Sequence, residues 1–169
     1  MRVLVSRWLI ARQLGLGLLA SASIAGANAQ LITHKDLPLA AALAVATAAS
    51  DQCKASGYKV SVTVVGREAQ IIVQLRGDDS PPHTIENSFR RAYTALTYRR
   101  PSREVEKRVR SDPGDQLVHL DEVMAAQGGL PIIVAGDTIG AVAVSGSPGG
   151  DKDEACAQAG LDKAANLLK

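Results

Sequence analysis

Two pairs of strand-like runs, each pair joined by a short turn, constrain the fold of this chain more than any other feature. In chain order the four runs, all rich in Val or Ile, are 59–65, 70–75, 130–134 and 138–144. Only residues 66–69 separate the first pair, and Ala135-Gly136-Asp137 separates the second. Runs of β-branched residues across so short a loop predict two β-hairpins. Because hairpin strands run antiparallel, we expect an antiparallel sheet.

Four helical segments are predicted around these hairpins. They cover 37–56, 84–98, 102–111 and a last segment from Asp151 onward. Asp36 and the Asp151-x-x-Glu154 capping box are expected to cap the first and last of them. Residues 116–127 are ambiguous, with a short helix inside a long loop as one interpretation. The order helix, two strands, two helices, two strands, helix predicts an α+β domain with an antiparallel β-sheet flanked by α-helices.

The first 29 residues have the pattern of an export signal. Arg2, Arg7 and Arg12 come first, an apolar stretch follows, and Ala27-Asn28-Ala29 offers small residues at a cleavage site. That order is typical of a secretory signal peptide. A membrane anchor is disfavoured because a spanning helix needs about 20 apolar residues. We therefore expect one domain over residues 30–169, periplasmic or secreted, with no membrane anchor in the mature chain.

The charge balance excludes one class of partner once the signal is removed. Without its three arginines the chain keeps 16 of its 19 basic residues against 17 acidic ones, a net charge of −1. Nucleic-acid binding depends on positive charge that neutralises phosphates. We expect no nucleic-acid partner.

The usual signatures of catalysis and metal binding are weak in this sequence. There is no Gly-x-Ser-x-Gly elbow for a nucleophilic serine, so we expect a binding protein rather than an enzyme. His34, His83 and His119 lie too far apart to share one helical face as metal ligands. The two cysteines, Cys53 and Cys156, suit either a disulfide in an oxidising compartment or two buried thiols.

The segment 84–98 carries the most informative polar pattern. An apolar stripe recurs at helical spacing at Ile85, Phe89, Ala92 and Leu96. The opposite face carries Asn87, Arg91, Thr94 and Tyr98, and between the two faces lie Glu86, Arg90, Tyr93 and Thr97. His83 precedes the helix, and Arg99 and Arg100 follow it. On spacing alone this surface is either solvated, a subunit interface with tyrosine anchors, or a ligand site.

Several runs along the mature chain resemble the GlcG/HbpS-type haem-binding family. In the first half these are Val60 to Val65, Leu75-Arg-Gly-Asp78, and Phe89-Arg-Arg-Ala-Tyr-Thr-Ala95 with Pro101. In the second half they are Gly128-Gly129-x-Pro131, Gly136-x3-Gly140-Ala141-Val142-x-Val144-Ser145-Gly146 and Asp153-Glu154-x-x-Ala157-x-Ala159-Gly160. The family usually has Asp where this chain has Gly66 and Gly where it has Ala69.

The resemblance implies a profilin-like fold, a homo-oligomer and non-covalent haem on or beside the helix 84–98. An exported member is expected to scavenge, store or sense haem and its iron. His83 is the first choice as iron ligand, with Thr94 and Tyr93 behind it, and helix arginines would pair with the propionates. The predicted haem-binding residues are His83, Asn87, Arg90, Arg91, Tyr93, Thr94 and Tyr98.

Two further expectations accompany this interpretation. The implied fold packs the first and last helices on one side of the sheet, which would bring Cys53 and Cys156 close together. The alternative function is a haem-free accessory protein that binds a small organic acid or assists assembly. In that case Arg90 and Arg91 would hold the carboxylate.

Overall fold

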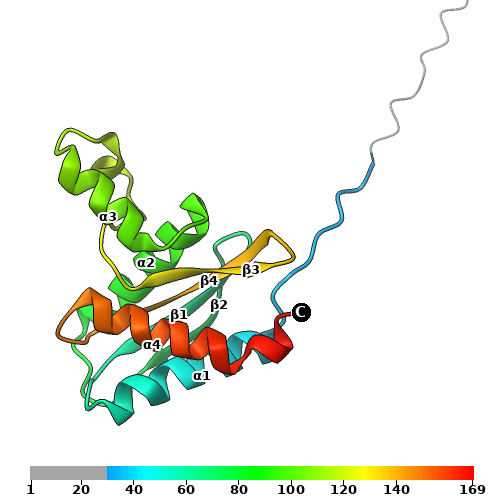
Figure 1. Ribbon diagram of the computed structural model, residues 1–169, viewed down its shortest axis with the longest axis horizontal. Coiled ribbons are helices and arrows are strands. Elements are labelled where there is room, and N and C mark those ends of the chain that lie inside the picture. The colour runs from blue at the N-terminus through cyan, green and yellow to red at the C-terminus, as the bar shows by residue number, and fades with distance from the viewer. Residues whose placement is uncertain (1–29) are drawn as a thin grey trace, which may run out of the picture. The chain divides into compact units, whose positions relative to one another are not determined.

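A four-stranded antiparallel sheet forms the centre of the domain (Figure 1). The structure, a computed structural model, describes residues 30–169, so the predicted signal peptide 1–29 lies outside the described residues. In chain order the strands are β1 (Ser61–Gly66), β2 (Ile71–Arg76), β3 (Gly129–Val134) and β4 (Asp137–Ser145). Their order across the sheet is β2-β1-β4-β3, which places each predicted hairpin at one edge. The predicted α+β class is confirmed.

Helices cover both faces of the sheet. The main helices are α1 (Leu39–Ala55), α2 (His83–Tyr98), α3 (Ser102–Ser111) and α4 (Gly150–Lys163). α1 and α4 lie side by side on one face, α2 lies on the other, and α3 projects from the end of α2 (Figure 1). Short 3₁₀ helices occupy Gln116–His119 and Ala165–Leu167. None of the helices within residues 30–169 is long and apolar enough to cross a membrane.

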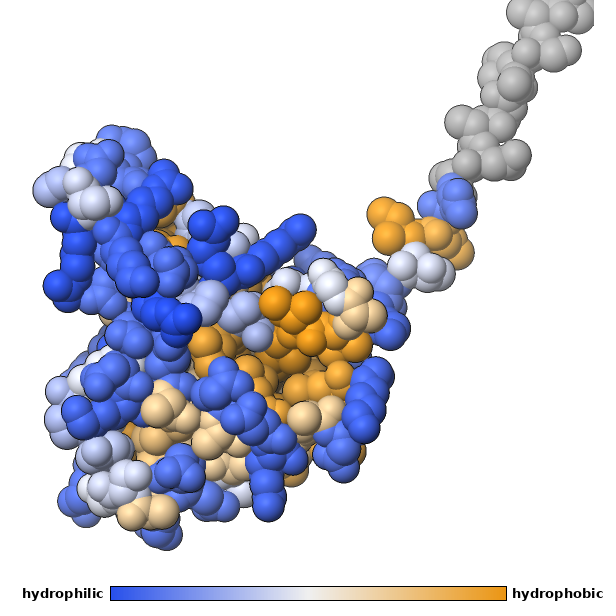
Figure 2. Space-filling model, viewed as in Figure 1, coloured by the Kyte–Doolittle hydropathy of each residue, from blue (hydrophilic) through white to orange (hydrophobic). Residues whose placement is uncertain are grey.

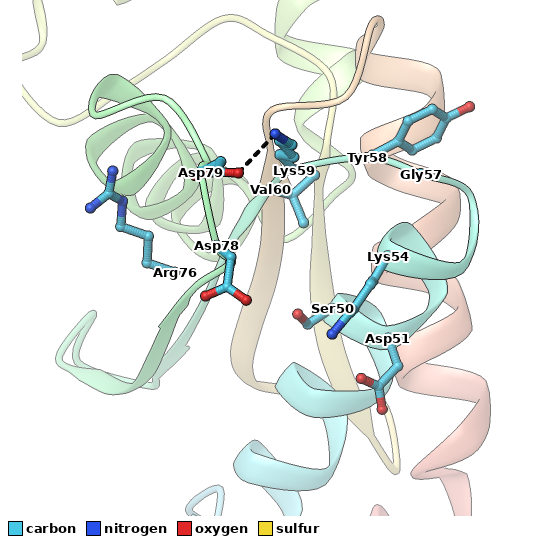
Figure 3. Close-up of a pocket in the computed structure, with 11 residues that line it drawn as sticks. Ser50, Asp51, Lys54, Gly57, Tyr58, Lys59, Val60, Arg76, Asp78 and Asp79 are labelled. Carbon is cyan, nitrogen blue, oxygen red and sulfur yellow. Dashed lines mark hydrogen bonds and ion pairs between the residues drawn. The ribbon is translucent and has the colours of Figure 1, made fainter.

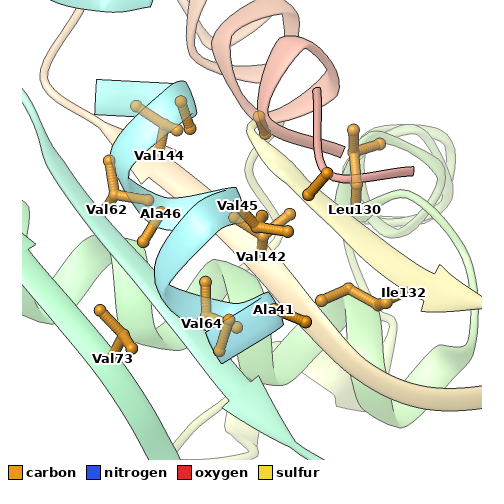
Figure 4. Packing of buried hydrophobic residues seen from close by; sticks show 14 of the residues in the cluster. Ala41, Val45, Ala46, Val62, Val64, Val73, Leu130, Ile132, Val142 and Val144 are labelled. Carbon is orange, nitrogen blue, oxygen red and sulfur yellow. The ribbon is translucent and has the colours of Figure 1, made fainter. Parts of the chain in front are cut away.

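The larger core lies between the sheet and the α1–α4 layer (Figure 4). Val62 and Val64 of β1 point into it, because alternate strand residues face opposite sides of a sheet. Ala42, Val45, Ala46 and Ala49 of α1 are fully buried against them, and the small size of the alanines lets the helix approach closely. At Gly160 of α4 the approach is tightest, since a Cβ there would lie 2.5 Å from the carbonyl oxygen of Val45.

A disulfide joins the two helices of this layer. Cys53 of α1 and Cys156 of α4 are bonded, with 5.6 Å between their Cα atoms. The predicted proximity is confirmed, and of the two states left open for these cysteines the structure has the disulfide.

Two predicted helix caps are wrong. α1 begins at Leu39 after Pro38, and Asp36 makes no capping bond. α4 begins after Gly149, also without a side-chain cap, so Asp151 and Glu154 form no capping box. Glu154 instead pairs with Arg103 of α3. The Glu154 carboxylate thus pairs with a residue of another helix and not with the N-terminus of its own helix.

The turn between β1 and β2 shows how this chain accommodates its departure from the family pattern. Ala69 adopts a positive φ of 60°, where a glycine carries no steric penalty. A Cβ at Gly66 would collide with the amide of Gln70, whose Oε1 accepts a hydrogen bond from the Glu68 N–H at 3.0 Å. The Gln70 side chain therefore occupies the space that an aspartate at position 66 would need.

Candidate functional site

The face of α2 that packs on the sheet carries buried hydroxyl groups near its start and buried alanines further along, where Ala92 and Ala95 pack against Val65, Ala141 and Ala143. Thr84 and Ser88 are fully buried there and bond to Ser61 and Thr63 of β1, at oxygen–oxygen distances of 2.8 and 2.7 Å. Buried hydroxyls need such partners to offset the loss of water. The predicted stripe is thus displaced around the helix, because Ile85, Phe89 and Leu96 are only half-buried while Ala92 is buried.

The Arg91 guanidinium bonds to groups inside the protein. Its Nη1 donates to the carbonyl oxygen of Val144 at 2.9 Å and to Oδ2 of Asp153 at 2.6 Å. Asp153 is only 2% exposed and also accepts from the N–H and hydroxyl of Ser147. This ion pair ties α2 to β4 and to the start of α4, so the Arg91 guanidinium already has a carboxylate partner within the chain.

Arg90 and Thr94 hold the segment that follows the first 3₁₀ helix. Arg90 Nη2 donates to the carbonyl oxygens of Asp121 and Val123 at 2.8 and 3.3 Å. The Thr94 hydroxyl donates to the Arg90 carbonyl and accepts from the N–H of Met124, both at 2.8 Å. Thr94 is fully buried, so its hydroxyl contacts protein groups rather than an open surface.

The other predicted site residues lie elsewhere on α2. His83 is the first residue of the helix and is exposed, and its imidazole makes no hydrogen bond to another described residue. Asn87 and Tyr98 are half-buried. Tyr93 lies on the flank that faces the β1–β2 turn, with its ring 6.2 Å from that of Phe89 and tilted by 55°. The structure therefore does not bring the seven predicted residues into one cluster.

A hollow of about 260 Å³ opens beside Tyr93, and we call it the Arg67–Arg99 hollow after two of its lining residues. It is built from the β1–β2 turn, the end of α2 and the start of β4, and it is lined by Arg67, Glu68, Ala69, Tyr93, Leu96, Thr97, Arg99 and Thr138. Beside it Arg67 donates to Asp137 at 2.5 Å, which holds the pKa of that carboxyl below its usual range. Apart from Tyr93 none of these residues belongs to the predicted haem-binding set.

A second hollow, of about 420 Å³, lies at the end of α1 (Figure 3). Lys59 donates to Asp79 at 3.0 Å beside it, while Ser50, Lys54 and Asp78 point toward the space between α1 and the end of β2. Three basic and three acidic side chains line this hollow, so its charge selects neither anions nor cations.

The described residues offer haem a partial fit. Within residues 30–169 no three His, Cys, Asp or Glu side chains gather as a metal cluster, so iron would depend on a single donor and on the porphyrin. The His83 imidazole suits that purpose because it is exposed and makes no internal hydrogen bond. The surface around α3 is strongly hydrophilic (Figure 2). The described chain therefore offers haem iron an exposed donor on the surface of α2.

Comparison with known proteins places this fold in a family. The model of the family described as "Haem degrading protein HbpS-like" matches residues 37–162, which include every strand and main helix described above except for Lys163, the last residue of α4. The chain belongs to the HbpS-like family. HbpS of Streptomyces reticuli, in a double-mutant form, has 34% identity and a TM-score of 0.76, covering 88% of this chain and 98% of that one.

Two further proteins extend the comparison. Protein GlcG of Escherichia coli K12 is 30% identical over 104 residues, which are 62% of this chain and 77% of GlcG. A structure described as a PduOC–haem complex covers 76% of this chain and 95% of its own, with a TM-score of 0.70. At 21% identity that likeness concerns the fold alone.

Proposed function

We propose that this protein binds haem non-covalently on the outer surface of α2 and that it scavenges, stores or senses haem outside the cytoplasm. Membership of the HbpS-like family over the whole folded domain is the observation that carries the proposal. The fold it shares with a PduOC–haem complex adds support.

His83 is the proposed iron ligand. Its imidazole is exposed, whereas the rival Thr94 hydroxyl is buried and already donates and accepts within the chain. Bound haem supplies an iron centre that can change oxidation state or take a further ligand. In this proposal Asn87, one turn along the helix, orients the imidazole or a propionate. The Arg90 side chain, which is 28% exposed, is the proposed cation for a propionate.

We propose a homo-oligomer in which a second copy supplies the other haem wall. An exposed ligand on a convex helix gives haem contact on one side only, and haem sites require a largely apolar enclosure. Tyr98, half-buried on α2, is a suitable anchor for such a contact. Light scattering tests this, because a monomer at working concentration contradicts it.

Hemin titration of the His83→Ala variant tests the ligand. We expect a saturable Soret band in the parent protein, and a shifted band with weaker binding in the variant. His119→Ala, which removes another exposed histidine, is the matched control and is expected to bind as the parent does. Parent-like binding by His83→Ala, with loss in Tyr93→Phe or Thr94→Val, refutes the choice of ligand. No Soret band in the parent refutes the haem proposal.

The family description speaks of haem degradation, whereas we propose binding without catalysis. The two are separated by following the hemin complex after adding a reductant or peroxide. A Soret band that persists supports binding alone. Its decay with stoichiometric iron release, faster than for free hemin, contradicts it.

Export is proposed from the first 29 residues and is tested by mass. Protein recovered from the periplasm or medium is expected to begin at Gln30. An intact mass that includes Met1 to Ala29 contradicts the proposal.

A further inference from the structure

The segment that precedes α1 is an exposed arm without regular structure. Every residue from Gln30 to Asp36, which we call the N-terminal arm, is exposed, and none of them belongs to a helix or strand. Leu31 and Ile32 are each 88% exposed. No hydrogen bond joins the Gln30 side chain to another residue between 30 and 169. The side-chain amide of Gln30 is therefore available for a reaction.

Removal of the proposed signal would place both partners of such a reaction in Gln30 itself. Cleavage after Ala29 leaves Gln30 with a free α-amino group. An α-amino group titrates close to neutral pH, so a fraction of it is unprotonated and nucleophilic there. The carboxamide carbon Cδ of the same side chain is an electrophile, and its attack by the amine closes a five-membered ring. Two groups held in one residue react as if at a very high concentration.

We propose that Gln30 of the mature protein is modified to pyroglutamate. The α-amino nitrogen forms a bond to Cδ, and the bond between Cδ and the amide nitrogen Nε2 breaks. Ammonia leaves with the proton that the amine loses. The reaction needs no oxidant and no second substrate. This inference rests on the export proposed above, because cleavage after Ala29 creates the amine.

The modification changes the chemistry of the chain end in two respects. The lactam nitrogen is not basic, so the net charge of the mature chain falls by one unit. The free amine that an aminopeptidase requires is also lost. Exposed chain termini are preferred sites of proteolysis, and an arm without regular structure offers no protection of its own. A blocked first residue supplies that protection outside the cytoplasm.

The arm is worth protecting because its last residues contact the folded domain. The carbonyl oxygen of Lys35 accepts a hydrogen bond from Arg67 Nη2 at 2.9 Å, and Leu37 is only 5% exposed in the main core. Stepwise removal of residues from Gln30 onward would reach Lys35 and delete this acceptor. The pyroglutamate prevents the first step of that removal.

Mass spectrometry of protein recovered from the periplasm or medium, and then incubated at neutral pH, tests the proposal. We expect a chain that starts at Gln30 and is lighter than its sequence by one molecule of ammonia. The loss should lie in the tryptic peptide 30–35, and that peptide should resist Edman degradation. A chain that starts at Gln30 and keeps its full mass and a free amine refutes the modification while export stands. A chain that retains Met1 to Ala29 refutes export, and with it the modification in the cell.

Gln30→Ala is the matched variant, because it keeps the amine and removes the carboxamide. We expect it to keep its full mass and to remain open to Edman degradation. A broad-specificity aminopeptidase should shorten the arm of this variant and leave the incubated parent intact. Equal loss of ammonia in both proteins places the reaction at another residue and refutes the assignment to Gln30. Equal shortening of both proteins refutes the protective role.

Discussion

Replacing Gly160 with alanine tests whether the α1–α4 contact is set by backbone proximity. A Cβ at this position would lie 2.5 Å from the Val45 carbonyl oxygen, 3.0 Å from Ala49 Cβ and 3.2 Å from the Ala49 nitrogen. Two of these three neighbours are backbone atoms, which cannot rotate away as the end of a flexible side chain can. The two helices would have to separate, although the Cys53–Cys156 disulfide one turn earlier on α4 holds them together.

Helix propensity and steric overlap have opposite effects on the free energy of unfolding of Gly160→Ala. Helix propensity alone favours alanine over glycine in a helix interior by about 1 kcal/mol. Overpacking a well-packed interior costs about 1–3 kcal/mol, and contact with backbone on the opposite helix belongs at the upper end of that range. We therefore expect a net loss of about 1–2 kcal/mol in the free energy of unfolding. For a domain of this size that is a fall of roughly 3–10 °C in melting temperature.

Thermal and urea denaturation of oxidised protein provide the measurement. Ala155→Gly, at an exposed position of the same helix, is the control that isolates propensity and is expected to cost about 1 kcal/mol. The sign of the Gly160→Ala effect is decisive, because propensity and packing predict opposite signs. A Gly160→Ala protein that melts at or above the parent refutes the close-contact argument.

Three further predictions follow from the fold. Replacing both cysteines with alanine should lower the free energy of unfolding by about 5 kcal/mol in the chain-entropy model, since the disulfide spans 103 residues; an unchanged urea midpoint contradicts this. Ala69→Gly should raise the free energy of unfolding by about 1 kcal/mol by relieving the positive φ, and a lower melting temperature would show that the turn is unstrained. Because Arg67 depresses the pKa of Asp137, the unfolded chain takes up a proton there at a higher pH than the folded protein does. The stability from this pair is therefore present above the ordinary carboxyl pKa and lost as the pH falls through the lower folded value. Asp137→Asn should flatten the acid side of the stability–pH profile, and an unchanged acid slope contradicts the assignment.

The elements of the fold were predictable because their signals are local. The segment 102–111 was predicted as a helix and α3 has those same bounds, since Pro101 ends the previous segment and permits a new helix. Both hairpins followed from β-branched runs flanking short turns. The Asp36 cap failed because α1 begins at Leu39, two residues later than predicted, and the Asp151–Glu154 box failed because α4 begins at Gly150 and Glu154 pairs with Arg103 of α3.

The orientation of α2 on the sheet could not be predicted from the residues of α2 alone. Its apolar stripe predicted Ile85 at the centre of the face against the sheet, but β1 presents Ser61 and Thr63 there. Phe89 is only partly buried, at the edge of the Val65–Ala92 cluster. The Ser61 and Thr63 hydroxyls require Thr84 and Ser88 as partners, and the pairing spans more than twenty residues. The helical period of the sequence identifies two faces of α2. It does not show which of them packs against a strand that is distant in sequence.

The arrangement of the predicted site residues could not be derived from the sequence. Arg91 and Thr94 were expected on an open face, and their partners Asp153 and Met124 lie 62 and 30 residues away. The Arg67–Arg99 hollow was missed because three separate segments build it. One signal was available in the sequence, namely Ala69 at a turn position where the family usually has glycine.

The layer formed by α1 and α4 determines the order in which the domain can be completed. α1 is synthesised first, but its covalent partner Cys156 is made 103 residues later. Until α4 emerges, Cys53 is a thiol with no partner in its own chain, and the alanine-rich face of α1 is only partly covered by the sheet. A nascent or truncated chain that ends before Gly150 is thus set up for cross-linking through Cys53 to a second such chain. The addition of α4 therefore completes the helical layer and also removes the reactive Cys53 thiol, because the disulfide can then form.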